Sequence, residues 1–280
     1  MDLSPALYQS IIDNALAEDI GNGDITTTLC IPAGTTATAN VLAKSPGVVA
    51  GLAVAAAVFH KLDPNAQWQP FVTDGTAVDG NRNIIARVAG DARALLTAER
   101  LALNFMQRMS GTATITRRFV DLVAGTNARI VDIRKTTPGL RILERYAVRA
   151  GGGHNHRFGL YDAVLIKDNH IRAAGGIKPA VDAARAGIPH TMKIEVETTS
   201  LDEVRQALGA RADIILLDNM DLATLKAAVD LVAGRAVTEA SGRVNESTVA
   251  AIAQTGVDVI SVGALTHSAP AMDISLDFEQ

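Results

Sequence analysis

ARIVDIR (128–134) is the first of six short apolar runs that decide the fold of this 280-residue chain. The others are DAVLIK (162–167), TMKIEVE (191–197), ADIILLD (212–218), RAVTEAS (235–241) and VDVISVG (257–263). Helical segments are predicted between most of these runs, at 138–149, 176–187, 199–209, 221–233 and 246–255. Apolar strands that alternate with helices indicate parallel strands joined by helical crossovers. Six such units without a glycine-rich dinucleotide signature favour an α/β barrel, and because eight strands are not visible we expect it to be incomplete.

The part of the chain before residue 91 has a different pattern, antiparallel β with a few helices. We predict a helix at 4–18, a turn and then a strand within 17–32, a strand at 36–50 broken at Pro46-Gly47, a helix at 51–61, and short strands joined by Asp-Gly turns at 68–90. The next segment, 91–125, reads as two helices separated at Gly111. The tail 269–280 alternates like a final strand that returns to the first domain.

Composition excludes several classes of protein. The formal net charge of −4 does not indicate a nucleic-acid binder. A single cysteine, Cys30, allows neither a disulfide within the chain nor a cysteine-based metal site, which fits a reducing cytoplasm. The acidic N-terminus does not read as a secretory signal, and the apolar run 48–59 is too short to span a bilayer, so we expect no membrane segment.

The predicted strands end in groups that can carry chemistry, which in a parallel barrel gather at one mouth. The ends are expected at Lys135, Lys167, Glu197, Asp218, Ser241 and Gly263. Each carboxylate alone is more often a helix cap, but a pair on adjacent strands can hold Mg²⁺ or accept hydrogen bonds from sugar hydroxyls. The small residues in EASGR and SVGAL suit a phosphate bound by backbone N–H groups, although tight turns also need glycine.

The stretch 131–170 concentrates positive charge in an otherwise acidic chain. Its cations are Arg134, Lys135, Arg141, Arg145, Arg149, His154, His156, Arg157 and Lys167. Arginine suits carboxylates bound through two hydrogen bonds, and lysine suits phosphate as a point charge. The mouth would therefore bind a polycarboxylate and a phosphorylated sugar with its metal. Three of these arginines share one helix face at i, i+4, i+8, and the direction of that face stays open.

Motifs along nearly the whole chain make it resemble the quinolinate phosphoribosyltransferase family. They are EDIGNGDITT (18–27), AERLALNFMQRMSG (98–111), RKTTPGLR (134–141), GGGHNHRFGLYDAVLIKDNHI (151–171), IEVE, LLDN, EASG and SVGALTHSAPAMDISLDF (261–278). The resemblance implies an N-terminal α/β sandwich domain (1–110, joined by the strand 270–280) and an incomplete parallel α/β barrel (111–269). It also implies a cytoplasmic homodimeric transferase of NAD biosynthesis, which makes nicotinate mononucleotide, pyrophosphate and CO₂ from quinolinate and phosphoribosyl pyrophosphate (PRPP) with Mg²⁺.

The resemblance also assigns residues. Lys135, Glu197 and Asp218 would be catalytic, and the two carboxylates would hold Mg²⁺. Arg100 would reach the partner's site across the dimer interface. The substrate contacts would be Arg100, Ile133, Arg134, Lys135, His156, Arg157, Lys167, Glu197, Asp218, Ser241, Gly242, Arg243, Val262, Gly263 and Ala264. Two positions depart from the family: Ile133 stands where Thr is usual, and Arg243 where a small residue is common.

Three other functions remain open on the sequence alone. The nearest is a paralogue with the same scaffold and a different acceptor, such as the related protein linked to molybdate transport. The density of cations favours a dicarboxylate and therefore quinolinate. A non-catalytic phosphoribosyl or nucleotide sensor is disfavoured by the two intact carboxylates, and a nucleic-acid module by the net charge and the lack of interleaved aromatic residues.

Overall fold

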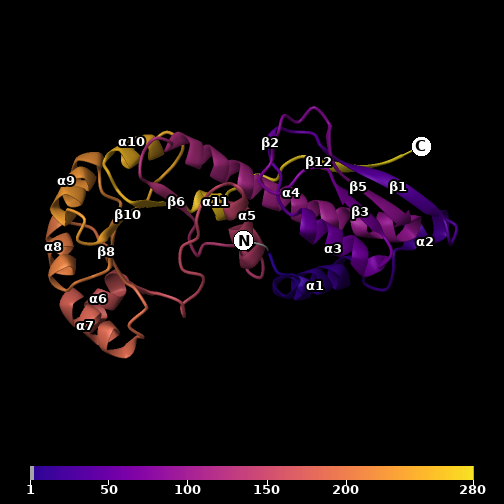
Figure 1. Ribbon diagram of the computed structural model, residues 1–280. Helices are drawn as coiled ribbons and strands as arrows, with labels where there is room; N and C mark the ends of the chain where they lie inside the picture. The colour runs from indigo at the N-terminus through magenta and orange to yellow at the C-terminus, as the bar shows by residue number, and fades with distance from the viewer. Residues whose placement is uncertain (1–2, 280) are drawn as a thin grey trace. The chain divides into compact units, whose positions relative to one another are not determined.

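A computed structural model describes residues 3–279, which form two compact units (Figure 1). Of the described residues, the first unit comprises those up to Arg117, Thr136–Gly152 and those from Leu265 onward, and the second comprises Arg118–Lys135 and Gly153–Ala264. Our expected division, 1–110 with 270–280 against 111–269, differs mainly in the segment 136–152. That segment groups with the first unit because its helix α5 (Arg141–Ala150) places Leu143 and Ala147 in the hydrophobic core there.

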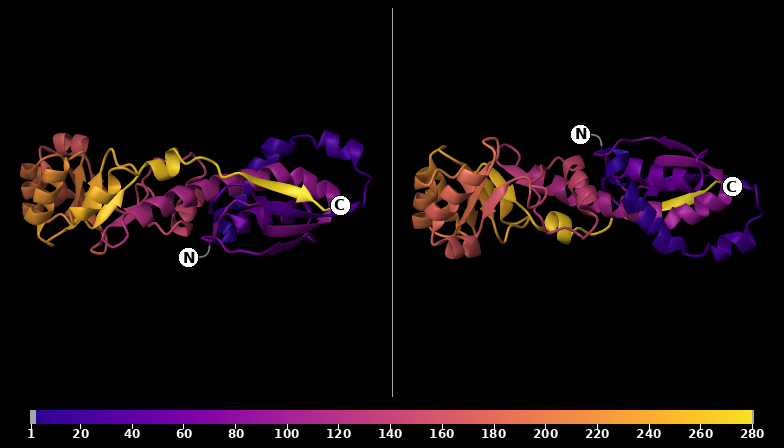
Figure 2. Two further views of the ribbon diagram at one scale, coloured as in Figure 1. Left: turned by 90° about the horizontal axis from the view of Figure 1, so that it is seen from above. Right: turned by 90° about the horizontal axis from the view of Figure 1, so that it is seen from below.

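The first unit is built on a four-stranded antiparallel sheet of order β12-β1-β5-β3. Its strands are β1 (Thr36–Ala43), β3 (Gln67–Pro70), β5 (Asn83–Asp91) and β12 (Ile274–Phe278). The chain tail pairs antiparallel with β1, with Val41 opposite Leu276, and Figure 2 shows it (yellow) along this sheet. This pairing confirms the prediction of a returning final strand. A short ladder joins β2 (Gly47–Val48) to β4 (Ala77–Val78).

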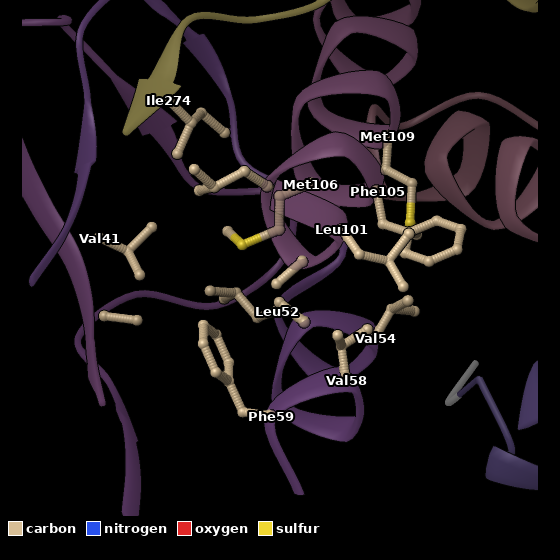
Figure 3. Packing of buried hydrophobic residues seen from close by; sticks show 14 of the residues in the cluster. Val41, Leu52, Val54, Val58, Phe59, Leu101, Phe105, Met106, Met109 and Ile274 are labelled. Atoms are coloured by element: carbon tan, nitrogen blue, oxygen red, sulfur yellow. The ribbon is translucent and has the colours of Figure 1, made fainter. Parts of the chain in front are cut away.

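The core of the first unit lies between this sheet and two helices, α3 (Leu52–Leu62) and α4 (Ala92–Leu122). Figure 3 shows side chains of both helices and of the sheet in this core. The prediction that Gly111 separates two helices is wrong, because α4 runs through it without interruption. A Cβ at Gly111 would lie 1.9 Å from the Pro270 carbonyl oxygen. The glycine therefore allows the returning tail to pass against the helix.

The N-terminal region is more helical than we predicted. The expected helix at 4–18 is a 3₁₀ turn (Pro5–Leu7) followed by α1 (Gln9–Ile20). The expected strand after the turn is instead α2 (Ile25–Cys30). Asp24 caps this helix by accepting a hydrogen bond from the Thr27 N–H at 2.9 Å, and it also accepts one from Thr97 Oγ1 at 2.9 Å. Capping and tertiary anchoring override the β propensity of a threonine-rich segment.

The second unit holds six parallel strands in the order β6-β11-β10-β9-β8-β7, which confirms the incomplete barrel. The strands are β6 (Arg129–Val131), β7 (Val164–Ile166), β8 (Ile194–Thr198), β9 (Ile214–Asp218), β10 (Val237–Ser241) and β11 (Val259–Ser261). The crossovers are α6 (Asp168–Ala174), α7 (Ile177–Gly187), α8 (Leu201–Gly209), α9 (Leu222–Val232) and α10 (Val249–Gln254). Figure 1 shows α7 to α10 on the outer side of the strands. Of these crossover helices, α6 is the one that was not expected. Among the described residues, no helix has the length and apolarity needed to cross a bilayer.

Candidate active site

Four of the expected functional groups stand at one edge of the six-stranded sheet. The register pairs Ile166 with Val196, so Lys167 follows β7 beside Glu197 of β8. On the next pair, Asp218 of β9 lies opposite Ser241 of β10. The Lys167 ammonium lies 2.8 Å from Glu197 Oε2. The structure thus brings these strand ends together, as predicted for a parallel barrel.

Two of the predicted strand ends were placed two or more residues too late, and a third was placed one residue too late, because β7 ends at Ile166 and not at Lys167. β6 ends at Val131 and not at Lys135, and β11 ends at Ser261 and not at Gly263. The residues that follow each strand leave the ladder as loop, which places them at the rim of the sheet. Functional groups of barrel enzymes commonly lie on such loops.

The loop after β6 is held beside the segment that carries His156 and Arg157. Asp132 is fully buried, and it accepts hydrogen bonds from the His156 N–H at 2.9 Å and from Asn155 Nδ2 at 2.5 Å. His154 forms a parallel bridge with Val131. This anchoring brings together two cationic segments that are more than 20 residues apart in the chain.

Two guanidinium groups lie close enough in this region to affect one another. Burial lowers the pKa of Arg157, and the positive charge of Arg134 lowers it further. Arg134 Nε is buried and has no hydrogen-bond acceptor among the residues that the structure describes. Arg157 Nη1 donates to the carbonyl of Ala163 at 3.0 Å. Like charges held together with a buried, unsatisfied donor are suited to an anion with two negative groups.

A cluster of three side chains inside the barrel was not foreseen in full. His156 Nε2 lies 3.1 Å from Glu195 Oε2 and 3.4 Å from Glu239 Oε1, and both carboxylates are almost fully buried. Sequence reasoning selected His156 and missed both glutamates. The missed signal is strand periodicity: Glu195 lies two residues before Glu197, and Glu239 two residues before Ser241, so each shares its neighbour's face. One ring nitrogen of His156 and one carboxylate oxygen each of Glu195 and Glu239 lie within 4.8 Å of one another. Atoms of these types can also bind a metal.

The turn after β10 is shaped by the side chain of Asn219. Asn219 Nδ2 donates to Asp218 Oδ2 at 2.7 Å, and its backbone N–H donates to the Ser241 carbonyl at 2.9 Å. Gly242 has a φ of +89°, and a Cβ there would lie 2.3 Å from Asn219 Oδ1. Glycine is therefore required here for tight packing as well as for backbone conformation.

The donor set fits Mg²⁺, which commonly takes one or two carboxylates and completes its shell with water and substrate phosphates. Glu197 and Asp218 are both half-buried at the strand ends. Their contacts with Lys167 and Asn219 each use one carboxylate oxygen. These two residues could therefore contribute their remaining oxygens to a metal.

Comparison with known proteins places the chain in a family. The model of the quinolinate phosphoribosyl transferase C-terminal domain matches residues 112–277, and that of the N-terminal domain matches 24–110. The chain belongs to the quinolinate phosphoribosyltransferase family. Relatives of this family include a probable nicotinate-nucleotide pyrophosphorylase [carboxylating] of Synechocystis, 47% identical over 93% of this chain and 89% of the relative. A probable nicotinate-nucleotide pyrophosphorylase [carboxylating] of Bacillus subtilis is 44% identical over 96% of this chain and 92% of the relative.

Solved structures of the quinolinate phosphoribosyltransferase family have the same fold. NadC from Streptococcus pyogenes superposes with a TM-score of 0.95 at 39% identity, with each chain covered completely. The nicotinate-nucleotide pyrophosphorylase from Francisella tularensis also gives 0.95, at 41% identity over 99% of this chain and 98% of that one.

The remaining family-expected residues take varied positions. Ile133 is half-buried and Lys135 exposed in the loop after β6, while Arg243 is exposed with a φ of +52°. The Val262 N–H donates to the Val131 carbonyl at 2.9 Å, and α11 (Ala264–His267) begins directly after Gly263.

Four arginines of the first unit differ in their exposure to solvent. Arg100 is exposed on α4. The helix face formed by Arg141, Arg145 and Arg149 is not a uniform surface, because the middle residue is fully buried and the last is exposed.

Proposed function

We propose that this chain transfers the phosphoribosyl group of PRPP to quinolinate with loss of one carboxylate, giving nicotinate mononucleotide, pyrophosphate and CO₂ in NAD biosynthesis. The observation that carries the proposal is the pair of guanidinium groups of Arg134 and Arg157. Quinolinate is a dianion whose two carboxylates flank a weakly nucleophilic ring nitrogen. Fixed guanidinium groups hold such a dianion and donate no proton to that nitrogen, because arginine stays protonated.

The protein contributes mainly position and electrostatics. The arginines orient the ring nitrogen toward the anomeric carbon, which develops positive character as pyrophosphate leaves. After attack the ring nitrogen is cationic, and this charge stabilises the carbanion left when the adjacent carboxylate departs as CO₂. The carbanion then takes up a proton from water to give nicotinate mononucleotide. No covalent nucleophile from the protein is needed. Lys167 adds positive charge at the rim beside Glu197. The family resemblance assigns a similar role to Lys135.

Glu197 and Asp218 would hold Mg²⁺ in this proposal. When bound, the metal supplies charge neutralisation for the leaving pyrophosphate. Lys167 pairs with Glu197 and therefore limits how many oxygens that carboxylate can offer. The turn at Ser241–Arg243 and the residues after β11, Gly263 and Ala264, would bind phosphate through backbone N–H groups. The Val262 N–H is already donated to the Val131 carbonyl, so Val262 would contribute by position only. With Ile133 in place of Thr, only the main chain could serve at that position.

The proposal includes a homodimer in the cytoplasm, in which Arg100 completes the partner's site. Its support is the family resemblance and the exposure of Arg100 on α4. Mixing an Arg100→Ala chain with an Arg157→Ala chain tests it, because a mixed dimer would contain one intact site. Partial recovery of activity is expected. No recovery after mass spectrometry has shown mixed dimers would refute the donation.

A direct assay tests the reaction. Incubation with carboxyl-labelled quinolinate, PRPP and Mg²⁺ should release labelled CO₂, and nicotinate in place of quinolinate should give little nucleotide. A paralogue with another acceptor would consume no quinolinate. Arg134→Ala and Arg157→Ala should each raise the KM for quinolinate by about 10- to 100-fold, since a hydrogen bond to a charged group contributes about 1.5–3 kcal/mol. The matched control is Arg205→Ala, an exposed arginine of the outer helix α8, which should leave KM unchanged. Unchanged quinolinate affinity in both site variants would refute the assignment.

A further inference from the structure

The His156 cluster lies within the second unit and supplies a role that the reaction above does not use. The side chains of Glu195 and Glu239 are 4% and 5% exposed, and that of His156 is 13% exposed. Burying two carboxylates without full pairing is costly, and Glu195 Oε1 has no hydrogen-bond partner among the described residues. A cost of this kind in a barrel interior calls for a functional explanation.

Both ring nitrogens of His156 are engaged within the chain. Nε2 faces the two carboxylates, at 3.1 Å from Glu195 and 3.4 Å from Glu239. On the other side, Nδ1 accepts the backbone N–H of Arg157 at 2.7 Å. An acceptor nitrogen needs its lone pair, so the ring proton must sit on Nε2. The imidazole is therefore clamped between the glutamates and the main chain at Arg157.

Two influences on this ring oppose each other. Burial lowers the pKa of His156, and the carboxylates of Glu195 and Glu239 raise it more, to about 10. The imidazolium would carry a second proton on Nδ1, directed at the Arg157 N–H. A pKa of about 10 favours an imidazolium at neutral pH, whereas the 2.7 Å hydrogen bond requires an Nδ1 without a proton and therefore the neutral ring. We assign the neutral ring on the hydrogen-bond geometry, against the direction of the pKa, because protonation of Nδ1 would break this contact with the main chain.

We propose that Glu195 and Glu239 are positioning residues that hold His156 as its Nε2–H tautomer, and that His156 in turn fixes the main chain at Arg157 and thereby the guanidinium that binds the dicarboxylate. His156 then acts through Arg157 and does not contact quinolinate through a ring nitrogen. This differs from the role that family resemblance gave it. The inference rests on the proposed function for its kinetic consequences only, because the tautomer is a property of the free protein.

The tautomer is measured directly by long-range ¹H–¹⁵N NMR of the histidine rings at neutral pH, in chelator-treated protein without substrate. The His156 signals are those that disappear in His156→Gln. One protonated and one unprotonated ring nitrogen, with the proton on Nε2, is the expected result. An imidazolium pattern, or a proton on Nδ1, overturns the proposal. Loss of the Nε2 proton when one equivalent of Zn²⁺ is added would also overturn the proposal, because it would show that the three side chains form a metal site.

Kinetics test the consequence for Arg157. Glu195→Gln keeps an oxygen acceptor for the Nε2–H and should leave the KM for quinolinate within about twofold of the wild type. Glu195→Ala removes the acceptor and should raise that KM by about 10- to 100-fold with a smaller change in the KM for PRPP, because a small displacement of a binding group is costly. If Glu195→Ala raised the KM for quinolinate and the KM for PRPP equally, the substitution would have damaged the whole site, and the proposal that Glu195 positions Arg157 would be refuted. If quinolinate shifted the NMR signals of both His156 nitrogens, and Glu195→Ala left the KM for quinolinate unchanged, His156 would contact quinolinate directly.

The two levels of the proposal fail in different ways. A wild-type protein with no turnover of quinolinate and PRPP would remove the proposed function and leave the NMR result intact. An active enzyme with the wrong tautomer would remove the positioning role alone.

Discussion

The substitution Gly242→Ala tests the packing of the turn after β10 most sharply. A residue other than glycine at φ +89° costs about 1–2 kcal/mol of conformational strain. The new Cβ would also lie 2.3 Å from Asn219 Oδ1, so the Asn219 amide must rotate away. That movement breaks its 2.7 Å hydrogen bond to Asp218, a loss of about 0.5–1.5 kcal/mol. The total loss of stability should be about 1.5–3.5 kcal/mol.

The matched control is Gly234→Ala, which isolates the backbone cost. Gly234 has a φ of +73°, and nothing lies within 4 Å of a Cβ placed there. Urea unfolding of the two variants should show Gly242→Ala to be less stable than Gly234→Ala by about 1 kcal/mol, the contribution of the displaced hydrogen bond. Only Gly242→Ala should also raise the Mg²⁺ concentration that gives half-maximal rate, because Asn219 orients Asp218. Equal stability of the two variants, with equal Mg²⁺ dependence, would refute the reasoning.

Three further substitutions probe the first unit. Gly111→Ala should destabilise it by about 1–3 kcal/mol in a thermal melt, because the new Cβ would lie 1.9 Å from the Pro270 carbonyl oxygen. The cost of this clash exceeds the gain in helix propensity. Glu144→Gln should cost about 2 kcal/mol in urea unfolding, because this buried carboxylate accepts hydrogen bonds from a guanidinium group and from a backbone N–H. Asp24→Ala should cost about 1 kcal/mol at neutral pH through loss of the helix cap. Hydrogen bonds from Thr27 lower the pKa of Asp24, so its contribution is present above the ordinary aspartate pKa of about 3.9 and is lost as pH falls through the lower folded value.

Controls for these three keep the interpretation specific. Gly187→Ala changes a helical glycine whose Cβ would meet nothing within 4 Å, so it should not destabilise the protein. A Gly111→Ala variant as stable as Gly187→Ala would contradict the account of the tail passing α4. Wild-type stability in Glu144→Gln would show that the negative charge of the buried carboxylate does not contribute to stability. A stability loss in Asp24→Ala that stays constant from neutral to acid pH would show that the carboxylate charge has no part in the cap.

The local pattern of the sequence determined the barrel and its functional edge. Short apolar runs and intervening helical segments specify parallel strands, and parallel strands necessarily present their carboxyl ends at one edge. Lys167, Glu197, Asp218 and Ser241 could therefore be placed together from the sequence alone. The two strand ends that were misplaced by two residues or more, after β6 and β11, follow short strands of three residues each. Little periodicity marks the boundary of so short a strand.

Only the tertiary structure decided which partners meet across long distances in the chain. Threonine-rich residues after Asp24 form a helix because a cap and a contact with α4 stabilise it, and Gly111 interrupts nothing because the returning tail needs its space. Likewise, His156 was selected from its neighbour Arg157, yet the direction of its ring depends on carboxylates about 40 and 80 residues further along the chain. Periodicity encodes the face of a strand on which a side chain lies. The identity of the group that it meets there depends on how separate strands are brought together, and that information exists only in the folded molecule.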